Sequence, residues 1–201
     1  MRALILVDIQ NDFLPGGSLA VEQGDEIITL VNSIQSKFDL VVASQDWHPE
    51  NHSSFASNHK NKEVFEVIKL NGQDQVLWPN HCVQGTDGAA FSSALNTDNV
   101  AAIFRKGMHK KVDSYSAFFD NNKTQHTGLE AYLKSMQVTD VYVCGLAADY
   151  CVYFTAKDAQ NLGFKTYYIT DATRYISEVV YNTALLDLKQ LGVTILNSAD
   201  I

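Results

Sequence analysis

The sequence predicts an α/β fold, with a central parallel sheet of about six strands flanked by helices on both faces. Short apolar runs alternate with longer amphipathic segments along most of the chain, and two glycines stand where helices should end. Strands that are buried on both faces give continuous apolar runs, and a helix between two strands forms the crossover that makes them parallel. The length of 201 residues is enough for one domain with a buried core.

Six apolar runs are expected to form the strands. They are residues 3–7, 40–43, 100–104, 141–144, 166–169 and 193–196. Four amphipathic segments between them are expected to form helices, at residues 25–38, 128–136, 149–162 and 177–191. Gly163 and Gly192 follow the last two segments directly, at the position where a helix C-cap favours glycine.

Residues 47–95 break this alternation. They are rich in His, Asn, Ser and Gly, which predicts a loop-rich insertion that folds over the edge of the sheet. A loop of this length inside a compact domain is usually functional. We therefore expect residues 1–201 to form a single domain whose insertion, at about 47–95, carries part of the site.

Composition excludes several classes of protein. The net charge of −8 disfavours binding to phosphate backbones, so no nucleic-acid partner is expected. No apolar run approaches the roughly 18 residues of a membrane span, and Asp8 interrupts the first run too early for a signal peptide. Three cysteines match no disulfide framework and are expected to be free thiols. The sequence thus predicts a cytoplasmic protein.

Three side chains with chemical potential follow predicted strands. Asp8 and Lys106 lie at or just past strand ends, and Cys151 lies where a strand turns into a helix. A helix N-terminus and a nearby cation should lower the pKa of a thiol, whose thiolate is the attacking species. Asp8 is a candidate acid or base. The alternatives are a buried core cysteine, a capping aspartate and a solvated lysine.

Histidines gather in the insertion, close to an acidic residue. Asp46 ends a strand, His48 follows two residues later, and His52 and His81 lie further along. One carboxylate with two or three imidazoles suits Zn²⁺ or Fe²⁺ and leaves positions for water or substrate. The spacing is not that of a zinc finger, so we expect an open site. The alternative is a set of polar loop histidines without a metal.

Six short segments, spread over nearly the whole chain, contain these residues. They are residues 7–13 (VDIQNDF), 45–49 (QDWHP), 78–86 (WPNHCVQGT), 105–107 (RKG), 113–118 (DSYSAF) and 145–152 (GLAADYCV). Together and in this order they resemble the nicotinamidase/pyrazinamidase family of isochorismatase-like cysteine hydrolases. Each segment alone is a weak signal, but six in family order are a strong one.

The resemblance implies which residues assist the nucleophilic cysteine. It implies a catalytic triad of Asp8, Lys106 and Cys151. It also implies a cis peptide bond before Ala147, and an oxyanion hole formed by the N–H groups of Ala147 and Cys151. The family often has threonine where this chain has Ala148, which removes a hydroxyl but leaves both backbone donors in place.

The resemblance also implies a metal site and a ring pocket. The expected ligands of one divalent ion, Zn²⁺ or Fe²⁺ with Mn²⁺ as a further choice, are Asp46, His48 and His81. His52 occupies a fourth ligand position that varies among family members. The aromatic residues that align with the family's ring pocket are Phe13, Trp78 and Tyr115.

The activity that the resemblance implies is hydrolysis of nicotinamide to nicotinate and ammonia through a cysteine thioester, in NAD salvage, with pyrazinamide as a second substrate. The three-layer isochorismatase-like fold and frequent self-association belong to the same expectation. The alternatives are an N-carbamoyl amidase or isochorismatase of the same fold, a metal-hydroxide hydrolase, and a binding protein without activity. N-carbamoyl amidases and isochorismatases lack the complete set of metal ligands that Asp46, His48 and His81 would form here.

Overall fold

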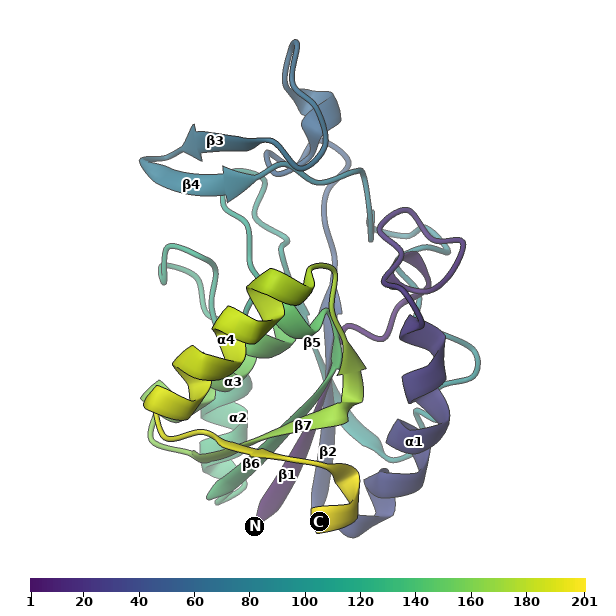
Figure 1. The fold of residues 1–201 in the computed structure, drawn as a ribbon, viewed down its shortest axis with the longest axis vertical. Helices are drawn as coiled ribbons and strands as arrows, with labels where there is room; N and C mark the ends of the chain where they lie inside the picture. The colour runs from purple at the N-terminus through teal and green to yellow at the C-terminus, as the bar shows by residue number, and fades with distance from the viewer.

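The computed structural model describes residues 1–201 and has a six-stranded parallel sheet at its centre (Figure 1). The strand order is β5-β2-β1-β6-β7-β8. These strands are β1 (Arg2–Val7), β2 (Leu40–Asp46), β5 (Val100–Lys106), β6 (Asp140–Leu146), β7 (Lys165–Arg174) and β8 (Thr194–Leu196). All neighbours in this sheet pair in parallel, so the carboxyl ends of the strands meet at one edge.

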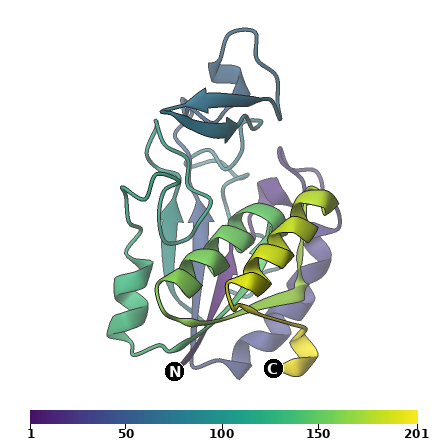
Figure 2. The same cartoon turned by 60° about the vertical axis from the view of Figure 1, so that its left-hand side comes forward.

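Helices cover both faces of the sheet, as Figures 1 and 2 show. They are α1 (Ile27–Ile34), α2 (Leu129–Ser135), α3 (Tyr153–Asn161) and α4 (Glu178–Gln190). Alternate residues of β1 explain the two layers. Leu4 and Leu6 join the apolar cluster that contains α1, whereas Ile5 and Val7 join the cluster that contains residues of α2, α3 and α4. The sheet is therefore buried on both sides, which accounts for its continuous apolar runs.

The predicted fold class, its six strands and its four helices are confirmed. Gly163 and Gly192 end α3 and α4 with φ of 89° and 88°, a left-handed conformation that glycine adopts without strain. Several boundaries differ: α1 is shorter than the predicted helix at residues 25–38, and β7 is longer than the predicted strand at residues 166–169. The sequence predicts a helix from residue 149, but a π-helical turn (Ala148–Val152) comes first and α3 begins only at Tyr153.

The insertion contains more regular structure than the sequence analysis expected. An antiparallel hairpin, β3 (Val67–Leu70) and β4 (Gln73–Val76), lies beyond the carboxyl edge of the sheet, at the top of Figure 1. Asn71 and Gly72 form its two-residue turn, with φ of 51° and 84°. An Asn-Gly pair is a strong hairpin signal, and the weak apolar character of these strands hid it.

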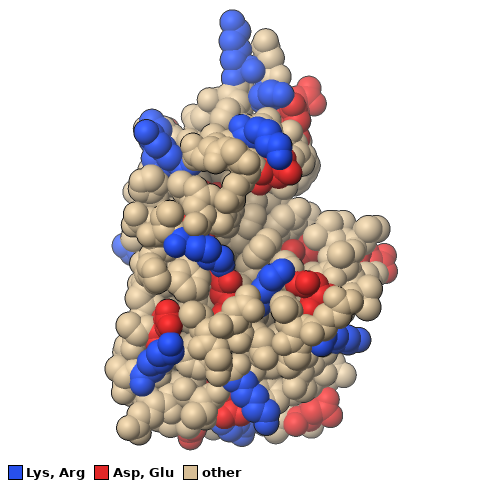
Figure 3. Space-filling model, turned by 90° about the vertical axis from the view of Figure 1, so that its left-hand side faces the viewer, with Lys and Arg blue, Asp and Glu red and all other residues tan.

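The surface is mixed in charge. On the face drawn in Figure 3, Lys and Arg side chains are scattered, and Asp and Glu lie beside several of them. No helix of the structure has the length and apolar character that crossing a bilayer requires. All three cysteines are free thiols and buried, as predicted.

Candidate active site

Four neighbouring strands deliver the predicted catalytic residues and one metal-ligand candidate to the same edge of the sheet. Asp46 and Lys106 are the last residues of β2 and β5 and are paired in register. Asp8 follows β1 directly, with φ of 48°, and Cys151 lies in the π-helical turn after β6. Because parallel strands end together, residues from distant parts of the sequence become neighbours here.

Lys106 is the centre of this group. Its ammonium donates hydrogen bonds to Asp46 Oδ1 at 3.1 Å, to the Ser114 carbonyl at 2.9 Å and to Cys151 Sγ at 3.5 Å. Asp8 Oδ2 lies 2.9 Å from the same nitrogen. Burial alone would lower the pKa of Lys106, but Asp46 and Asp8 outweigh it and raise the pKa well above its ordinary value. The lysine is therefore a permanent cation.

The two oxygens of the Asp8 carboxylate have different partners. Ser44 Oγ donates to Oδ1 over 2.7 Å. Oδ2 is fully buried beside the Lys106 ammonium, whose Nζ lies 2.9 Å away. Burial raises the pKa of Asp8, with Lys106 acting in the opposite direction. Such a carboxylate is suited to accept a proton.

Cys151 differs from the expectation in one respect. The sequence analysis expected a lowered thiol pKa, but burial raises the pKa of Cys151 well above its ordinary value, and Lys106 opposes the rise only in part. The physical reason is that the thiol is almost fully covered and faces the carboxylates of Asp8 and Asp46 as well as the cation. This direction favours the protonated thiol, so a neighbouring base would have to take its proton before attack.

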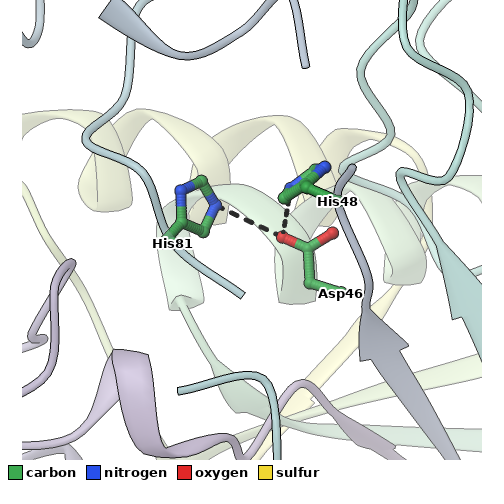
Figure 4. A group of neighbouring side chains, drawn as sticks. All are labelled: Asp46, His48 and His81. Atoms are coloured by element: carbon green, nitrogen blue, oxygen red, sulfur yellow. Dashed lines mark hydrogen bonds and ion pairs between the residues drawn. The ribbon is translucent and has the colours of Figure 1, made fainter. Parts of the chain in front are cut away.

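Asp46, His48 and His81 lie together, as predicted. Both His Nε2 atoms point at one oxygen, Asp46 Oδ2, at 2.9 Å for His48 and 3.4 Å for His81 (Figure 4). All three residues are buried, and their candidate ligand atoms lie within 4.8 Å of one another. Burial would raise the pKa of Asp46, but His48 and Lys106 reverse this and hold it well below its ordinary value.

Backbone carbonyls orient both imidazoles for a metal ion. His48 Nδ1 lies 2.9 Å from the Gly107 carbonyl, and His81 Nδ1 lies 2.8 Å from the Pro79 carbonyl. A carbonyl only accepts, so each Nδ1 carries the proton, and in the neutral ring Nε2 keeps its lone pair. Two lone pairs that converge on a carboxylate repel one another unless a positive charge lies between them. Burial would lower the pKa of His48, but Asp46 outweighs it and raises the pKa, so a proton can supply this charge. A divalent ion would replace that proton, and one carboxylate with two imidazoles fits such an ion.

His52 lies beside the Asp46, His48 and His81 group but is close enough to share an ion only with His48 among them. Its candidate ligand atom groups with those of His48 and Asp113. Nδ1 lies 2.7 Å from Ser54 Oγ, and Nε2 is buried without a hydrogen-bond partner. Burial, followed by the charge of His48, lowers the pKa of His52 to about 4, so the ring is neutral at pH 7. A fourth-ligand role for His52 remains a prediction.

A small cavity lies between the Lys106 group and the group that contains Asp46 and His81. Cys151 lines it together with Asp46 and His81, so the nucleophile candidate and the metal candidate face the same space. The three aromatic residues predicted for the ring pocket, Phe13, Trp78 and Tyr115, all line it. Ala147 also lines it, and the peptide bond before it is cis, as the resemblance implied.

Four further residues of this wall were not predicted from the sequence: Leu19, Asp113, Tyr150 and Ile176. Tyr150 neighbours Cys151 in the chain, and Asp113 lies within a motif already quoted, so both had a signal. Ile176 comes from the segment between β7 and α4, where Asp149 accepts the backbone N–H groups of Ile176 and Ser177. Nothing in its local sequence marks it.

Comparison with known proteins places this geometry in a family. The isochorismatase domain model matches residues 2–200. The nicotinamidase of Acinetobacter baylyi is 49% identical over 87% of this chain and 81% of its own length. The nicotinamidase of Escherichia coli is 44% identical over 99% of this chain and 96% of its own length.

Solved structures agree with these relatives. A nicotinamidase/pyrazinamidase of Acinetobacter baumannii superposes with a TM-score of 0.97 at 48% identity, covering 99% of this chain and 97% of its own. A pyrazinamidase of Pyrococcus horikoshii, in complex with zinc, has a TM-score of 0.80 at 38% identity and covers 98% of both chains. An L. infantum relative in complex with nicotinate has a TM-score of 0.87 at 40% identity, covering 99% of this chain and 93% of its own.

Proposed function

We propose that this chain, which belongs to the isochorismatase domain family, is a nicotinamidase that hydrolyses nicotinamide to nicotinate and ammonia. One observation carries the proposal beyond similarity. Cys151 and the metal candidates Asp46 and His81 line the same cavity, whose remaining wall is largely aromatic and aliphatic. A flat heteroaromatic amide has the two ends that such a cavity separates, a ring nitrogen and a carboxamide.

The metal end would orient the substrate. Asp46, His48 and His81 would hold one divalent ion, with His52 as a candidate fourth ligand. When bound, the ion supplies a Lewis acid for the ring nitrogen, so that the carboxamide is directed towards Cys151. Phe13, Trp78 and Tyr115 would pack against the ring. Zinc is favoured by the zinc complex of the P. horikoshii relative, and Fe²⁺ and Mn²⁺ suit the same ligands.

The thiol end would carry out the chemistry. Asp8 takes the Cys151 proton, and the thiolate attacks the amide carbon while Lys106 stabilises the negative charge. The N–H groups of Ala147 and Cys151 would bind the oxyanion. The C–N bond then breaks, Asp8 returns the proton to the leaving nitrogen as ammonia forms, and a thioester remains. Asp8 next takes a proton from water, whose oxygen attacks the thioester carbon. The C–S bond breaks to release nicotinate, and Asp8 returns its proton to the Cys151 sulfur.

The role in the cell follows from the product. Nicotinate from nicotinamide is a precursor for NAD salvage, and we propose this role together with a cytoplasmic location and self-association. Pyrazinamide differs from nicotinamide by one ring nitrogen, so the same cavity should accept it. The M. tuberculosis nicotinamidase/pyrazinamidase, 34% identical over 99% of this chain and all of its own length, supports this second substrate.

Ammonia release from nicotinamide tests the proposal directly, with metal analysis of the same sample. The purified chain should release ammonia, and Cys151→Ala should abolish release while the metal content stays unchanged. Cys144→Ala is the matched control, because Cys144 is a buried thiol of β6 outside the cavity, and it should keep its activity. Substantial activity in Cys151→Ala would disprove the thiol mechanism, and a metal-hydroxide hydrolase would then be the better assignment.

A further inference from the structure

Gln10 is a fully buried glutamine whose side chain forms two hydrogen bonds with the backbone of Asp46. Its Nε2 donates to the Asp46 carbonyl at 2.8 Å, and its Oε1 accepts from the Asp46 N–H at 2.8 Å. The second Nε2 proton goes to the Ala89 carbonyl at 2.9 Å. Both donors and the acceptor of the carboxamide are thus used, and two of the three bonds hold a single residue.

The register of the sheet explains why Asp46 needs this partner. In a strand, the N–H and C=O of alternate residues point to the same neighbour. Ser44 accepts a hydrogen bond from the Asp8 N–H, so the backbone groups of Asp46 also face the side of β1. However, β1 ends at Val7, and Asp8 turns the chain away with φ of 48°. The Gln10 side chain takes the place of the missing strand.

Asp46 is the residue on which both halves of the site depend. Its Oδ1 binds Lys106 at 3.1 Å, and its Oδ2 faces the Nε2 atoms of His48 and His81. It is the last residue of β2, where backbone is ordinarily free to fray. With both backbone groups held, the Asp46 backbone cannot shift without breaking two buried hydrogen bonds, so its carboxylate extends from a fixed Cα.

We propose that Gln10 is a positioning residue of the metal site, fixing the Asp46 carboxylate by bonding both backbone groups of that residue. The inference rests on the proposed function only in taking Asp46 as a metal ligand. Gln10 also lies two residues from Asp8. One short loop therefore places the proton acceptor and holds the metal ligand, which keeps the two ends of the substrate at a fixed separation.

A second glutamine offers a matched control. Gln45 is also buried, and its Nε2 donates to the same Ala89 carbonyl at 2.9 Å. Its Oε1 accepts from Arg105, and it has no hydrogen bond to Asp46. Gln45→Met and Gln10→Met thus each remove one hydrogen bond to the Ala89 carbonyl and conserve side-chain size. Only Gln10→Met also removes the two hydrogen bonds to the Asp46 backbone.

The experiment measures zinc affinity of the metal-free protein by competition with a chelator. Gln10→Met should weaken zinc binding about 10–100-fold, the range found when outer partners of metal ligands are lost, whereas Gln45→Met should change it less than about threefold. The rise in melting temperature on adding zinc, taken as a difference within each variant, should shrink for Gln10→Met alone.

Unchanged zinc affinity in Gln10→Met, or an equal loss in Gln45→Met, would overturn the inference. Should Gln10→Met fail to fold, Gln10→Glu retains the acceptor for the Asp46 N–H but not the amide donors, and must also weaken zinc binding for the inference to stand. The result is independent of the substrate. A protein that released no ammonia from nicotinamide but lost zinc affinity in Gln10→Met would disprove the proposed function and support the role of Gln10.

Discussion

The Lys106 ammonium and the Cys151 thiol lie 3.5 Å apart, Nζ to Sγ, although β5 and β6, which lead to them, are separated in the sheet by β2 and β1. The lysine spans the ends of both intervening strands and contacts Asp46 and Asp8 on the way. One buried cation therefore contacts the proposed proton acceptor, the proposed nucleophile and a candidate metal ligand. If these roles hold, the charge of the metal site would influence the reactivity of the thiol through Lys106.

Replacing Lys106 with methionine removes the only cation that lowers the pKa of Cys151. We expect iodoacetamide to alkylate Cys151 at least about tenfold more slowly at pH 7.5, and kcat/KM for nicotinamide to fall about 100-fold or more. Lys157→Met is the control, because Lys157 pairs with Asp187 between α3 and α4. Equal alkylation rates in wild type and Lys106→Met, corrected with Cys151→Ala, would exclude activation by the lysine.

The protonation of Asp8 should set the acidic limb of activity. Asp8 must be ionised to accept the thiol proton, and burial raises its pKa above the ordinary 3.8, so kcat/KM should fall on acidification at a pH above that value. Ser44 donates a hydrogen bond that lowers this pKa. Ser44→Ala should therefore move the limb to higher pH, and a limb that does not move would show that another group controls it.

The raised pKa of Asp8 also affects the stability of the folded protein. A carboxyl group whose pKa is raised on folding binds its proton more tightly in the folded state. Its contribution to the free energy of unfolding is therefore full below 3.8, its ordinary value, and is lost as pH rises through the folded pKa. Retaining Asp8 at this position thus serves proton transfer at a cost in stability near neutral pH.

Much of this site could be predicted from sequence because its residues follow strands. Apolar runs locate the strands, and the carboxyl ends of parallel strands meet at one edge, so residues that follow strands, such as Asp8 and Lys106, are candidates for a common site. Their roles came from the family resemblance, since an aspartate after a strand is equally well a cap. The strand order, which places β1 and β2 between Lys106 and Cys151, has no signature in the apolar pattern.

Two features could not be predicted, for different physical reasons. The raised pKa of Cys151 depends on burial, and burial depends on how residues distant in sequence pack over the thiol. Ile176 reaches the cavity because Asp149 binds the backbone N–H groups at 176 and 177, a contact across 27 and 28 residues. Local propensity carries information about neither, because both arise from tertiary packing.

The two tryptophans allow the ring pocket to be tested by fluorescence. Trp78 lines the cavity, whereas Trp47 stacks against Arg105, 3.9 Å from the guanidinium carbon to the ring centroid, and does not line it. Nicotinate should quench the emission of Trp47→Phe but not that of Trp78→Phe. In Trp78→Ala, loss of one aromatic wall should raise KM for nicotinamide about 5–10-fold, equivalent to about 1–1.5 kcal/mol of ring contact, with a smaller effect on kcat. Quenching that survives in Trp78→Phe would place the ligand elsewhere.

Gly107 follows Lys106 at a point where no side chain fits. A Cβ there would lie 2.4 Å from His48 Cε1 and 2.8 Å from Asp46 Oδ1, and the residue has a φ of 66°. Gly107→Ala should therefore displace His48 and weaken zinc binding about 10–100-fold, as when a ligand loses its support. The left-handed backbone should also cost about 1–2 kcal/mol of stability.

Gly85→Ala separates these two effects. Gly85 has a similar φ of 78°, but a Cβ there would meet no atom within 4 Å. It should show the same backbone cost of about 1–2 kcal/mol in chemical denaturation of the zinc-free protein. However, its zinc affinity, measured by chelator competition, should equal that of wild type. Equal zinc affinities in the two variants would mean that His48 tolerates displacement, and the close approach of Gly107 to the metal ligands would then have no functional role.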